Sequence, residues 1–258
     1  MSAYPFEIDE DATQPGEAMR RMNRMYRLQR HVYDATRLYY LLGRDRMIAN
    51  LRPANGANVL EIGCGTARNL VHAARLYPNA QFFGIDVSTE MLTSAIAAIS
   101  RAGLAGRIKV AHGDATAVHP QKLFAVASFD HVMISYSLSM IPDWRGVLKA
   151  AADNLKPGGR LHVIDFGNQE RLPVIVRVLL RRWLAMFDVT PRDDLKPELL
   201  AIAEACGADA WCADDGGKDL FVRSWGSWLL PCSSNAAKRR AAVMSAVSRN
   251  RKQPSKRP

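Results

Sequence analysis

The sequence has no long hydrophobic run. No stretch reaches the roughly 18 consecutive uncharged apolar residues that a membrane-spanning helix needs. The first 14 residues are acidic and polar, so they lack the basic start and apolar centre of a secretory signal. With 48% hydrophobic residues among 258, the chain can still bury a sizeable core. We therefore expect a cytoplasmic protein with one large domain.

Cysteine is also scarce, with four residues in the chain. Cys64 lies inside a glycine-rich turn, and Cys206, Cys212 and Cys232 do not have the spacing of metal ligands. We predict buried or unreactive thiols, no metal site, and a reducing compartment.

Acidic residues are missing from the C-terminal end. Residues 233–258 contain eight Lys or Arg residues and no Asp or Glu, so they carry +8 of the net charge of +10 and leave +2 for residues 1–232. Most such basic tails are disordered and solvated. We predict a disordered basic tail at 233–258 and a disordered acidic segment at 1–16. We expect no nucleic-acid binding by the folded domain.

Apolar segments that alternate with helical patterns fill the middle of the chain. The predicted strands are Asn58–Ile62, Gln81–Ile85, Ile108–Ala111, Phe129–Ile134 and Arg160–Asp165, and the predicted helices are Asn69–Leu76, Glu90–Ser100 and Trp144–Leu155. This alternation is typical of right-handed crossovers and a parallel sheet covered on both faces. We predict a doubly wound α/β domain over residues 55–232, preceded by a helical lid over residues 17–54.

The pattern changes after Asp165. Two helices, Leu172–Phe187 and Pro197–Cys206, are predicted before an antiparallel hairpin of Ala208–Ala213 and Leu220–Trp225. These last two strands would complete a mostly parallel sheet of seven strands.

The helix predicted at 172–187 is rich in both apolar residues and arginine. Its pattern places apolar side chains on one side and Arg177 and Arg181 on another; the apolar residues are Ile175, Val178, Leu179, Trp183 and Met186. This composition suits a helix that lies on a bilayer surface. The alternative is a lid helix packed on the sheet with its arginines in water.

A glycine-rich turn follows the first strand. Glu61-Ile62-Gly63-Cys64-Gly65-Thr66-Ala67 ends an apolar strand in Gly-x-Gly and runs into a helix, which allows the backbone to approach a ligand closely. Arg68 stands where a dinucleotide-binding turn has its third glycine. The carboxylate of Glu61 suits a ligand with a positive amino group and a sulfonium better than a diphosphate.

Acidic residues follow the next two strands. Asp86 ends the second strand, where a carboxylate can accept both ribose hydroxyls. Asp114 follows the third strand, in His112-Gly113-Asp114-Ala115, where a carboxylate can accept from an adenine amino group. The local alternative is that both residues only cap helices.

Together these motifs resemble those of class I S-adenosylmethionine-dependent methyltransferases across roughly residues 55–165. The resemblance implies a Rossmann-like fold and S-adenosylmethionine as cofactor. The cofactor-binding residues it implies are Glu61, Gly63, Cys64, Gly65, Asp86, Val87, Met91, Gly113, Asp114, Ala115 and Ser135. The alternative is a nucleotide-fold domain with a degenerate site.

The segment from His31 to Arg46 resembles the N-terminal segment of bacterial betaine-lipid methyltransferases, and this resemblance extends over about residues 20–230. Those enzymes methylate the amine of diacylglyceryl-homoserine three times. The resemblance implies a lipid substrate and peripheral association with the inner face of the membrane.

An acceptor site with an aromatic box is expected for such a substrate. The residues predicted to surround the methylated ammonium are Tyr33, Tyr39, Tyr40 and Tyr136. Arg44 or Arg46 would pair with a carboxylate of the substrate or the donor. The alternatives are core packing for the tyrosines and a solvated helix surface for the arginines.

Two rival functions stay open. One is methylation of another small molecule, a phospholipid or a quinone-like compound, with the apolar helices as a lid. The other is a non-enzymatic binding protein whose basic tail recruits nucleic acid. The sequence makes no prediction of the oligomeric state.

Overall fold

The computed structural model describes residues 43–166, 169, 172–206, 211–212 and 225–231. The predicted acidic segment, the basic tail, most of the helical lid, and Tyr33, Tyr39 and Tyr40 lie outside these residues. Among the described residues, no helix is long and apolar enough to cross a membrane.

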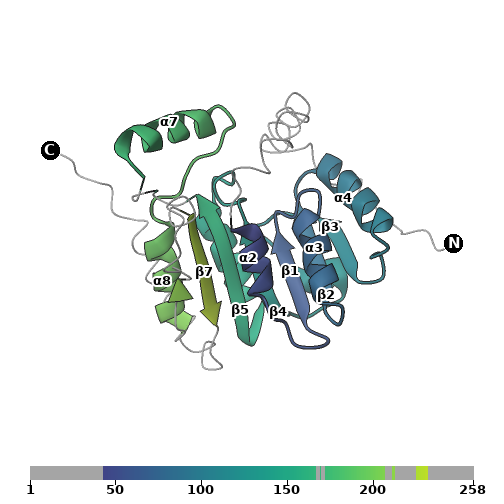
Figure 1. The fold of residues 1–258 in the computed structure, drawn as a ribbon. Coiled ribbons are helices and arrows are strands. Elements are labelled where there is room, and N and C mark those ends of the chain that lie inside the picture. Colours follow the sequence, from purple (N-terminus) through teal and green to yellow (C-terminus); the bar gives the residue numbers. More distant parts are fainter. Residues whose placement is uncertain (1–42, 167–168, 170–171, 207–210, 213–224, 232–258) are drawn as a thin grey trace.

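Five parallel strands form the body of the sheet. They are β1 (Asn58–Ile62), β2 (Gln81–Asp86), β3 (Ile108–His112), β4 (Phe129–Ser135) and β5 (Leu155–Phe166). Two further strands, β7 (Trp225–Pro231) and β6 (Trp211–Cys212), extend the sheet, giving the order β3-β2-β1-β4-β5-β7-β6 (Figure 1). The strand order reverses between β1 and β4, where ligands bind in open α/β sheets. The predicted doubly wound fold is confirmed.

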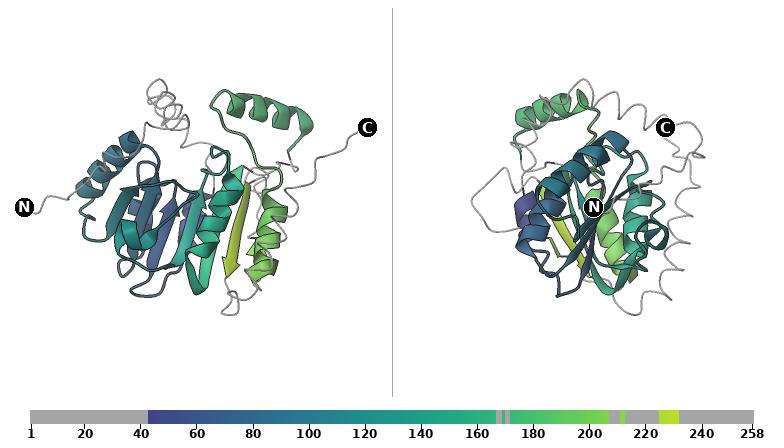
Figure 2. Two further views of the ribbon diagram at one scale, coloured as in Figure 1. Left: turned by 180° about the vertical axis from the view of Figure 1, so that it is seen from behind. Right: turned by 90° about the vertical axis from the view of Figure 1, so that its right-hand side faces the viewer.

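Helices cover both faces of the sheet (Figure 2). One face packs against α2 (Arg44–Ala49), α3 (Arg68–Leu76) and α4 (Thr89–Arg101). The other packs against α5 (Pro120–Phe124), α6 (Trp144–Asp153) and α8 (Leu195–Cys206). The remaining helix, α7 (Val174–Ala185), lies at the end of the sheet where the parallel strands finish (Figure 1).

Each of the five parallel strands contributes to two hydrophobic clusters because successive side chains point to opposite faces. Val59 packs into the cluster beneath α3 and α4, whereas Leu60 packs into the cluster beneath α6 and α8. Both side chains are fully buried. Burial on both faces explains why these strands are continuous apolar runs in the sequence.

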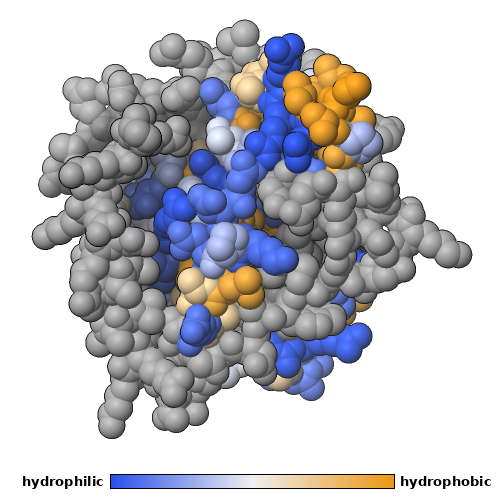
Figure 3. Space-filling model, turned by 90° about the vertical axis from the view of Figure 1, so that its left-hand side faces the viewer, coloured by the Kyte–Doolittle hydropathy of each residue, from blue (hydrophilic) through white to orange (hydrophobic). Residues whose placement is uncertain are grey.

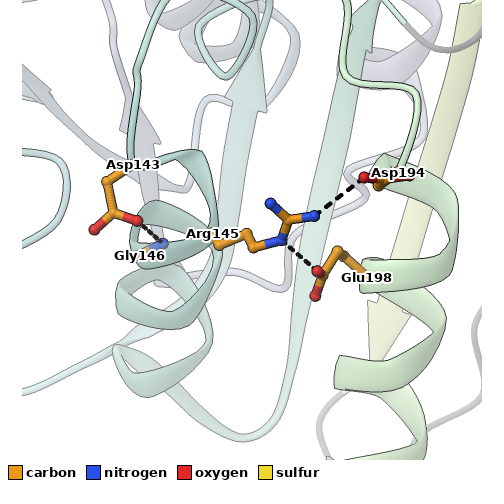
Figure 4. A network of polar contacts seen from close by, with 5 residues as sticks. All are labelled: Asp143, Arg145, Gly146, Asp194 and Glu198. Atoms are coloured by element: carbon orange, nitrogen blue, oxygen red, sulfur yellow. Dashed lines mark hydrogen bonds and ion pairs between the residues drawn. The ribbon is translucent and has the colours of Figure 1, made fainter. Parts of the chain in front are cut away.

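Polar contacts add to the packing between α6 and α8. Arg145 of α6 pairs with Glu198 of α8 and, at 3.3 Å, with Asp194 just before it (Figure 4). Asp143 caps α6 by accepting a hydrogen bond from the amide of Gly146. The Arg145 side chain is 46% exposed, so these ion pairs add little to stability.

The predicted position of the closing hairpin was wrong in part. Its second strand was expected at Leu220–Trp225; residues 220–224 lie outside the described residues, and β7 continues past the predicted end, from Trp225 to Pro231. Trp225 pairs with Phe166 and Pro231 with Arg160, so β7 runs antiparallel along the edge of β5. The hydrogen-bonded register with β5 fixes the end of β7, which composition alone did not locate.

Smaller boundary differences have local causes. The helical pattern before the sheet was predicted to end at residue 50, and α2 ends at Ala49, ahead of Pro53. Leu155 was predicted to end a helix, but it starts β5, whose register shifts between the pairs Phe129–Leu155 and His131–Arg160. The Pro157-Gly158-Gly159 turn lies inside this irregularity.

Two buried histidines face each other across β4 and β5. The Nδ1 atom of His131 lies 3.0 Å from the Nε2 atom of His162. Burial and the charge of Arg160 lower the pKa of His131 to about 4. Burial, His131 and Arg160 lower the pKa of His162 well below its usual value. The folded protein therefore keeps both rings neutral at pH values where the unfolded chain binds protons.

This pair predicts a loss of stability on acidification. For His131, stability is fully present above pH 6.5, the unfolded pKa, and falls as pH drops toward about 4. At pH 5 the loss is about 2 kcal/mol for one such group. His131→Asn with His162→Gln retains polar atoms near the contact but removes both titrations. Urea unfolding at pH 7 and pH 5 should show a flatter pH dependence for this variant than for the wild type.

The control is His119→Asn, at an exposed position before α5. It should keep the wild-type pH dependence. If the free energy of unfolding fell equally between pH 7 and pH 5 in the wild type and in the double variant, the acid sensitivity would not come from His131 and His162. Burial raises the pKa of Asp165 to about 6, which opposes the trend in the same pH range. Because Asp165 is present in every variant, its contribution cancels in the comparison.

Candidate active site

The turn between β1 and α3 has three residues with left-handed backbone, Gly63 (φ 72°), Gly65 (φ 52°) and Ala67 (φ 59°). The amides of Gly63 and Cys64 both donate to the carbonyl of Ile85, at 2.9 and 3.0 Å. The turn is thereby tied to the end of β2. A Cβ atom on Gly63 would lie 2.6 Å from the Cβ of Ser137, so only glycine fits there.

Gly65, unlike Gly63, has space around it for a Cβ atom. A Cβ atom there would meet nothing within 4 Å, so the turn borders open space on this side. Ala67 is fully buried and is the N-cap of α3, in the left-handed conformation that glycine adopts most readily. The predicted glycine turn therefore has room for a ligand beside Gly65 and close packing at Gly63.

Asp86 joins two turns at the carboxyl edge of the sheet. Its Oδ2 atom accepts a hydrogen bond from the amide of Gly65 at 2.7 Å, and its Oδ1 atom accepts one from the amide of Ser88 at 2.9 Å. A carboxylate has about four lone-pair directions in all, more than these two hydrogen bonds use. The geometry fits the predicted role of Asp86.

Glu61 is a buried acid on the neighbouring strand. Its Oε1 atom accepts a hydrogen bond from Asn69 of α3 at 2.7 Å, and the residue is 1% exposed. Burial and the charges of Asp86 and Glu61 raise the pKa of the Cys64 thiol well above its usual value. The donor side of the site is therefore strongly acidic, which favours a cationic ligand.

The side chain of Cys64 does not face the predicted ligand. It packs toward β2, since a Cβ atom on Gly84 would lie 2.8 Å from its sulfur. Cys64 belongs to the cluster beneath α3 and α4. Its raised pKa keeps the thiol protonated, so any contact with the donor comes from its backbone.

Ser135 supplies a polar group at the end of β4. Ile134 pairs with Ile62, so Ser135 comes next to Gly63 along the edge of the sheet. Its hydroxyl is buried and has no hydrogen-bond partner among the described residues. An unsatisfied buried hydroxyl is costly unless a ligand completes it. This position fits the methionine end of S-adenosylmethionine.

The predicted adenine side is more open. Asp114 is exposed, and its Oδ1 atom accepts hydrogen bonds from both the amide and the hydroxyl of Thr116 at 2.8 Å. Its other carboxylate oxygen is not used by this turn. Gly113 donates to the carbonyl of Asp86 at 3.1 Å, so the β2 and β3 ends are tied together. Ala115, Val87 and Met91 are half-buried beside them.

The predicted aromatic box is not what the structure shows at Tyr136. This residue is 4% exposed, has left-handed backbone (φ 56°), and packs against Phe166 with ring centroids 5.0 Å apart. Burial and Asp165 raise the pKa of Tyr136 well above its usual value, and Arg44 opposes that rise. Tyr136 is therefore a packed core residue that lies within electrostatic reach of Arg44 and Asp165.

The two candidate arginines of α2 differ in position. Arg44 is 9% exposed and acts on Tyr136, whereas Arg46 is exposed. The structure thus favours Arg44 over Arg46 as a group at the carboxyl ends of β4 and β5.

Three polar residues at this edge were missed by the sequence analysis. Asp165 is fully buried and accepts from the amides of Ser139 at 3.2 Å and Phe166 at 2.7 Å. Arg192 donates to the carbonyls of Leu138 and Ile141 at 3.0 and 2.8 Å. The side-chain amide of Gln169 is buried without a described partner. Asp165 lies at the end of β5 and Gln169 shortly after it, which is the only sequence signal for these two, whereas Arg192 lies between α7 and α8, where no pattern marks it.

The comparisons with known proteins agree with this geometry. Residues 53–203 match the protein family described as "Methyltransferase domain". The chain belongs to this methyltransferase-domain family. The predicted Rossmann-like fold and S-adenosylmethionine as its cofactor are confirmed, and the open turn at Gly65, Asp86 and the unsatisfied hydroxyl of Ser135 fit that cofactor.

Two curated methyltransferases are similar to this chain over about half of its length. The demethylmenaquinone methyltransferase of Listeria monocytogenes serotype 4a is 33% identical over 123 residues, 47% of this chain and 50% of that protein. The nocamycin O-methyltransferase of Saccharothrix syringae is 33% identical over 132 residues, 50% of this chain and 45% of that protein. The chain thus spans about half the length of these relatives.

A solved structure shares the fold. The phosphoethanolamine N-methyltransferase 2 of Haemonchus contortus, in complex with S-adenosyl-L-methionine, matches with a TM-score of 0.57. The match covers 74% of this chain and 52% of that one at 16% identity.

The site generates a prediction about Asp86. Asp86→Ala removes a charged acceptor from the glycine turn and from the predicted ribose site. At about 1.5–3 kcal/mol for hydrogen bonds to a charged group, affinity for S-adenosylmethionine should fall roughly ten- to a hundredfold. Isothermal titration calorimetry measures this. Asp153→Ala, at an exposed residue of α6, is the matched control and should bind like the wild type. Unchanged affinity in Asp86→Ala would remove this residue from the donor site.

Proposed function

We propose that this protein transfers methyl groups from S-adenosylmethionine to the amine of diacylglyceryl-homoserine, giving diacylglyceryl-N,N,N-trimethylhomoserine. It would act in betaine-lipid synthesis at the inner face of the membrane. The proposal joins the donor site at β1, β2 and β4 with the resemblance of residues 20–230 to betaine-lipid methyltransferases.

The donor half of the mechanism follows from the described residues. When bound, S-adenosylmethionine supplies an electrophilic methyl group on a sulfonium. Asp86 holds the glycine turn in place, and Glu61 adds negative charge beside it. The backbone of Gly63 and the hydroxyl of Ser135 border the methionine end. These groups align the donor and do not take part in bond making.

The observation that carries the acceptor assignment is the position of Arg44. A homoserine headgroup has a carboxylate beside its amine, and a buried guanidinium binds a carboxylate through two parallel hydrogen bonds. Arg44 is nearly buried at the carboxyl edge of the sheet, within electrostatic reach of Tyr136. It would hold the headgroup carboxylate while the amine faces the methyl group.

No described residue needs to act as a strong base. The raised pKa of Tyr136 keeps its phenol protonated at neutral pH. Asp165 is covered by the amides of Ser139 and Phe166, so it orients the loop after β4 and does not reach a substrate. A desolvated amine can lose its proton to water before the transfer.

A second candidate function is methylation of a quinone-like compound. The demethylmenaquinone methyltransferase of Listeria monocytogenes is 33% identical over 123 residues, which favours this class among the rivals. Such an acceptor has no carboxylate, so it would not need Arg44.

The direct test incubates the purified protein with labelled S-adenosylmethionine and one acceptor at a time in detergent micelles. The acceptors are diacylglyceryl-homoserine, phosphatidylethanolamine and demethylmenaquinone. Mass spectrometry should find mono-, di- and trimethylated products from the homoserine lipid. Methylated product from demethylmenaquinone alone would contradict the proposal and support the quinone-like class.

Arg44 and Arg46 provide a matched pair of variants on one helix. Arg44→Gln should raise KM for the homoserine lipid roughly ten- to a hundredfold, the equivalent of about 1.5–3 kcal/mol for a charged hydrogen-bond partner. Affinity for S-adenosylmethionine should stay unchanged, which shows that the variant is folded. Arg46→Gln, at the exposed position, should keep the wild-type KM. Equal KM values for both variants would place the carboxylate elsewhere.

A further inference from the structure

Exposed apolar side chains are concentrated at α7. Of the nine large hydrophobic residues exposed in the described part of the chain, six belong to this helix or to its C-cap. These six are Val174, Ile175, Val176, Val178, Leu179 and Met186. Ile175 is 75% exposed and Met186 73%. In Figure 3, a hydrophobic patch at the upper edge of the molecule lies beside strongly hydrophilic residues.

The opposite side of α7 is anchored. Leu184 is buried, and Leu180 and Trp183 pack against the cluster beneath α3 and α4. Trp183 also contacts Phe187, with ring centroids 5.0 Å apart. The helix is therefore fixed to the domain by one side, and its apolar outward side faces away from the described core.

Positive charge accompanies this apolar surface. The helix contains Arg177, Arg181 and Arg182 and no Asp or Glu. Arg181 pairs with Asp193, whereas Arg177 and Arg182 form no ion pair with another described residue. Apolar side chains flanked by arginines match the boundary between acyl chains and anionic headgroups of a bilayer.

A second copy of the chain is a poorer occupant. A two-fold symmetric interface would place the same patch on both subunits and bring the arginines of the two helices together. A nucleic acid would match the arginines but would leave the apolar residues in water. An anionic bilayer satisfies both features.

The location of α7 links this surface to the active site. The segment that follows α7 is tied to the carboxyl edge of the sheet, because the amide of Thr190 donates to the carbonyl of Ser139 and the amide of Arg192 to that of Phe166. Figure 1 shows α7 beyond the ends of β4 and β5. A bilayer bound at α7 would therefore lie on the side where the donor and acceptor meet.

We propose that the outward side of α7 is the docking surface for an anionic lipid bilayer. The apolar residues enter the interface, and Arg177 and Arg182 contact anionic headgroups. The inference rests on the proposed function in one respect, because a lipid acceptor would be located in the bilayer that α7 binds.

Vesicle flotation of the full chain tests this proposal. The probes are vesicles of phosphatidylcholine and vesicles of phosphatidylcholine mixed with phosphatidylglycerol. The wild type should float with the anionic vesicles. Ile175→Glu with Leu179→Glu should lower this binding roughly tenfold or more. Arg177→Gln with Arg182→Gln should lower binding to the anionic vesicles and leave binding to phosphatidylcholine unchanged.

The matched control is Ile96→Glu with Leu200→Glu. These residues are equally apolar, each 43% exposed, and lie on α4 and α8. This control should float like the wild type. Because every variant keeps residues 233–258, any contribution of the basic tail is the same in all of them. Unchanged affinity for S-adenosylmethionine verifies that each variant is folded.

Several results would overturn the docking surface. One is that the wild type does not float with anionic vesicles, and another is that the α7 variants float like the wild type. A third is that the wild type sediments as a dimer and the glutamate variant of α7 as a monomer. Loss of flotation without any methylation of the homoserine lipid would leave the docking surface standing and refute the proposed function. If the α7 variant methylated the homoserine lipid normally in micelles but more slowly on vesicles, the result would support both the docking surface and the proposed function.

Discussion

The carboxylate of Asp86 is the constraint on which the donor side depends. It accepts hydrogen bonds from the amides of Gly65 and Ser88, which belong to turns after two different strands. If either turn moved away, a carboxylate that is 8% exposed would lose a charged hydrogen bond. The glycine turn is therefore held open beside Gly65 before any ligand binds, which reduces the ordering required for binding.

A second buried carboxylate organises the other half of the same edge. Asp165 accepts from the amide of Ser139, and Arg192 donates to the carbonyls of Leu138 and Ile141. The loop after β4 is thus held from two sides. This support helps to explain how Tyr136 keeps a left-handed backbone, a conformation that costs free energy for a residue with a large side chain.

The division between donor and acceptor elements explains the breadth of the relatives. The family match covers residues 53–203, which include β1 to β5 and the turns that border the donor. A shared fold supports many acceptors, because acceptor specificity lies in the elements placed around the donor site. In this chain we propose α2, with Arg44, and α7, with its exposed apolar side, as described elements of that kind.

The sequence by itself determined the five parallel strands and the donor turn. Continuous apolar runs and a Gly-x-Gly turn are local patterns, and Asp86 follows its strand directly, so neighbouring residues were sufficient to locate them. Only the tertiary structure decided the register of β7, the contact between His131 and His162, and the burial of Arg44 and Tyr136. These features depend on residues far apart in the chain, whose pairing is set by hydrogen-bonded register and by space in the core. No local pattern carries that information.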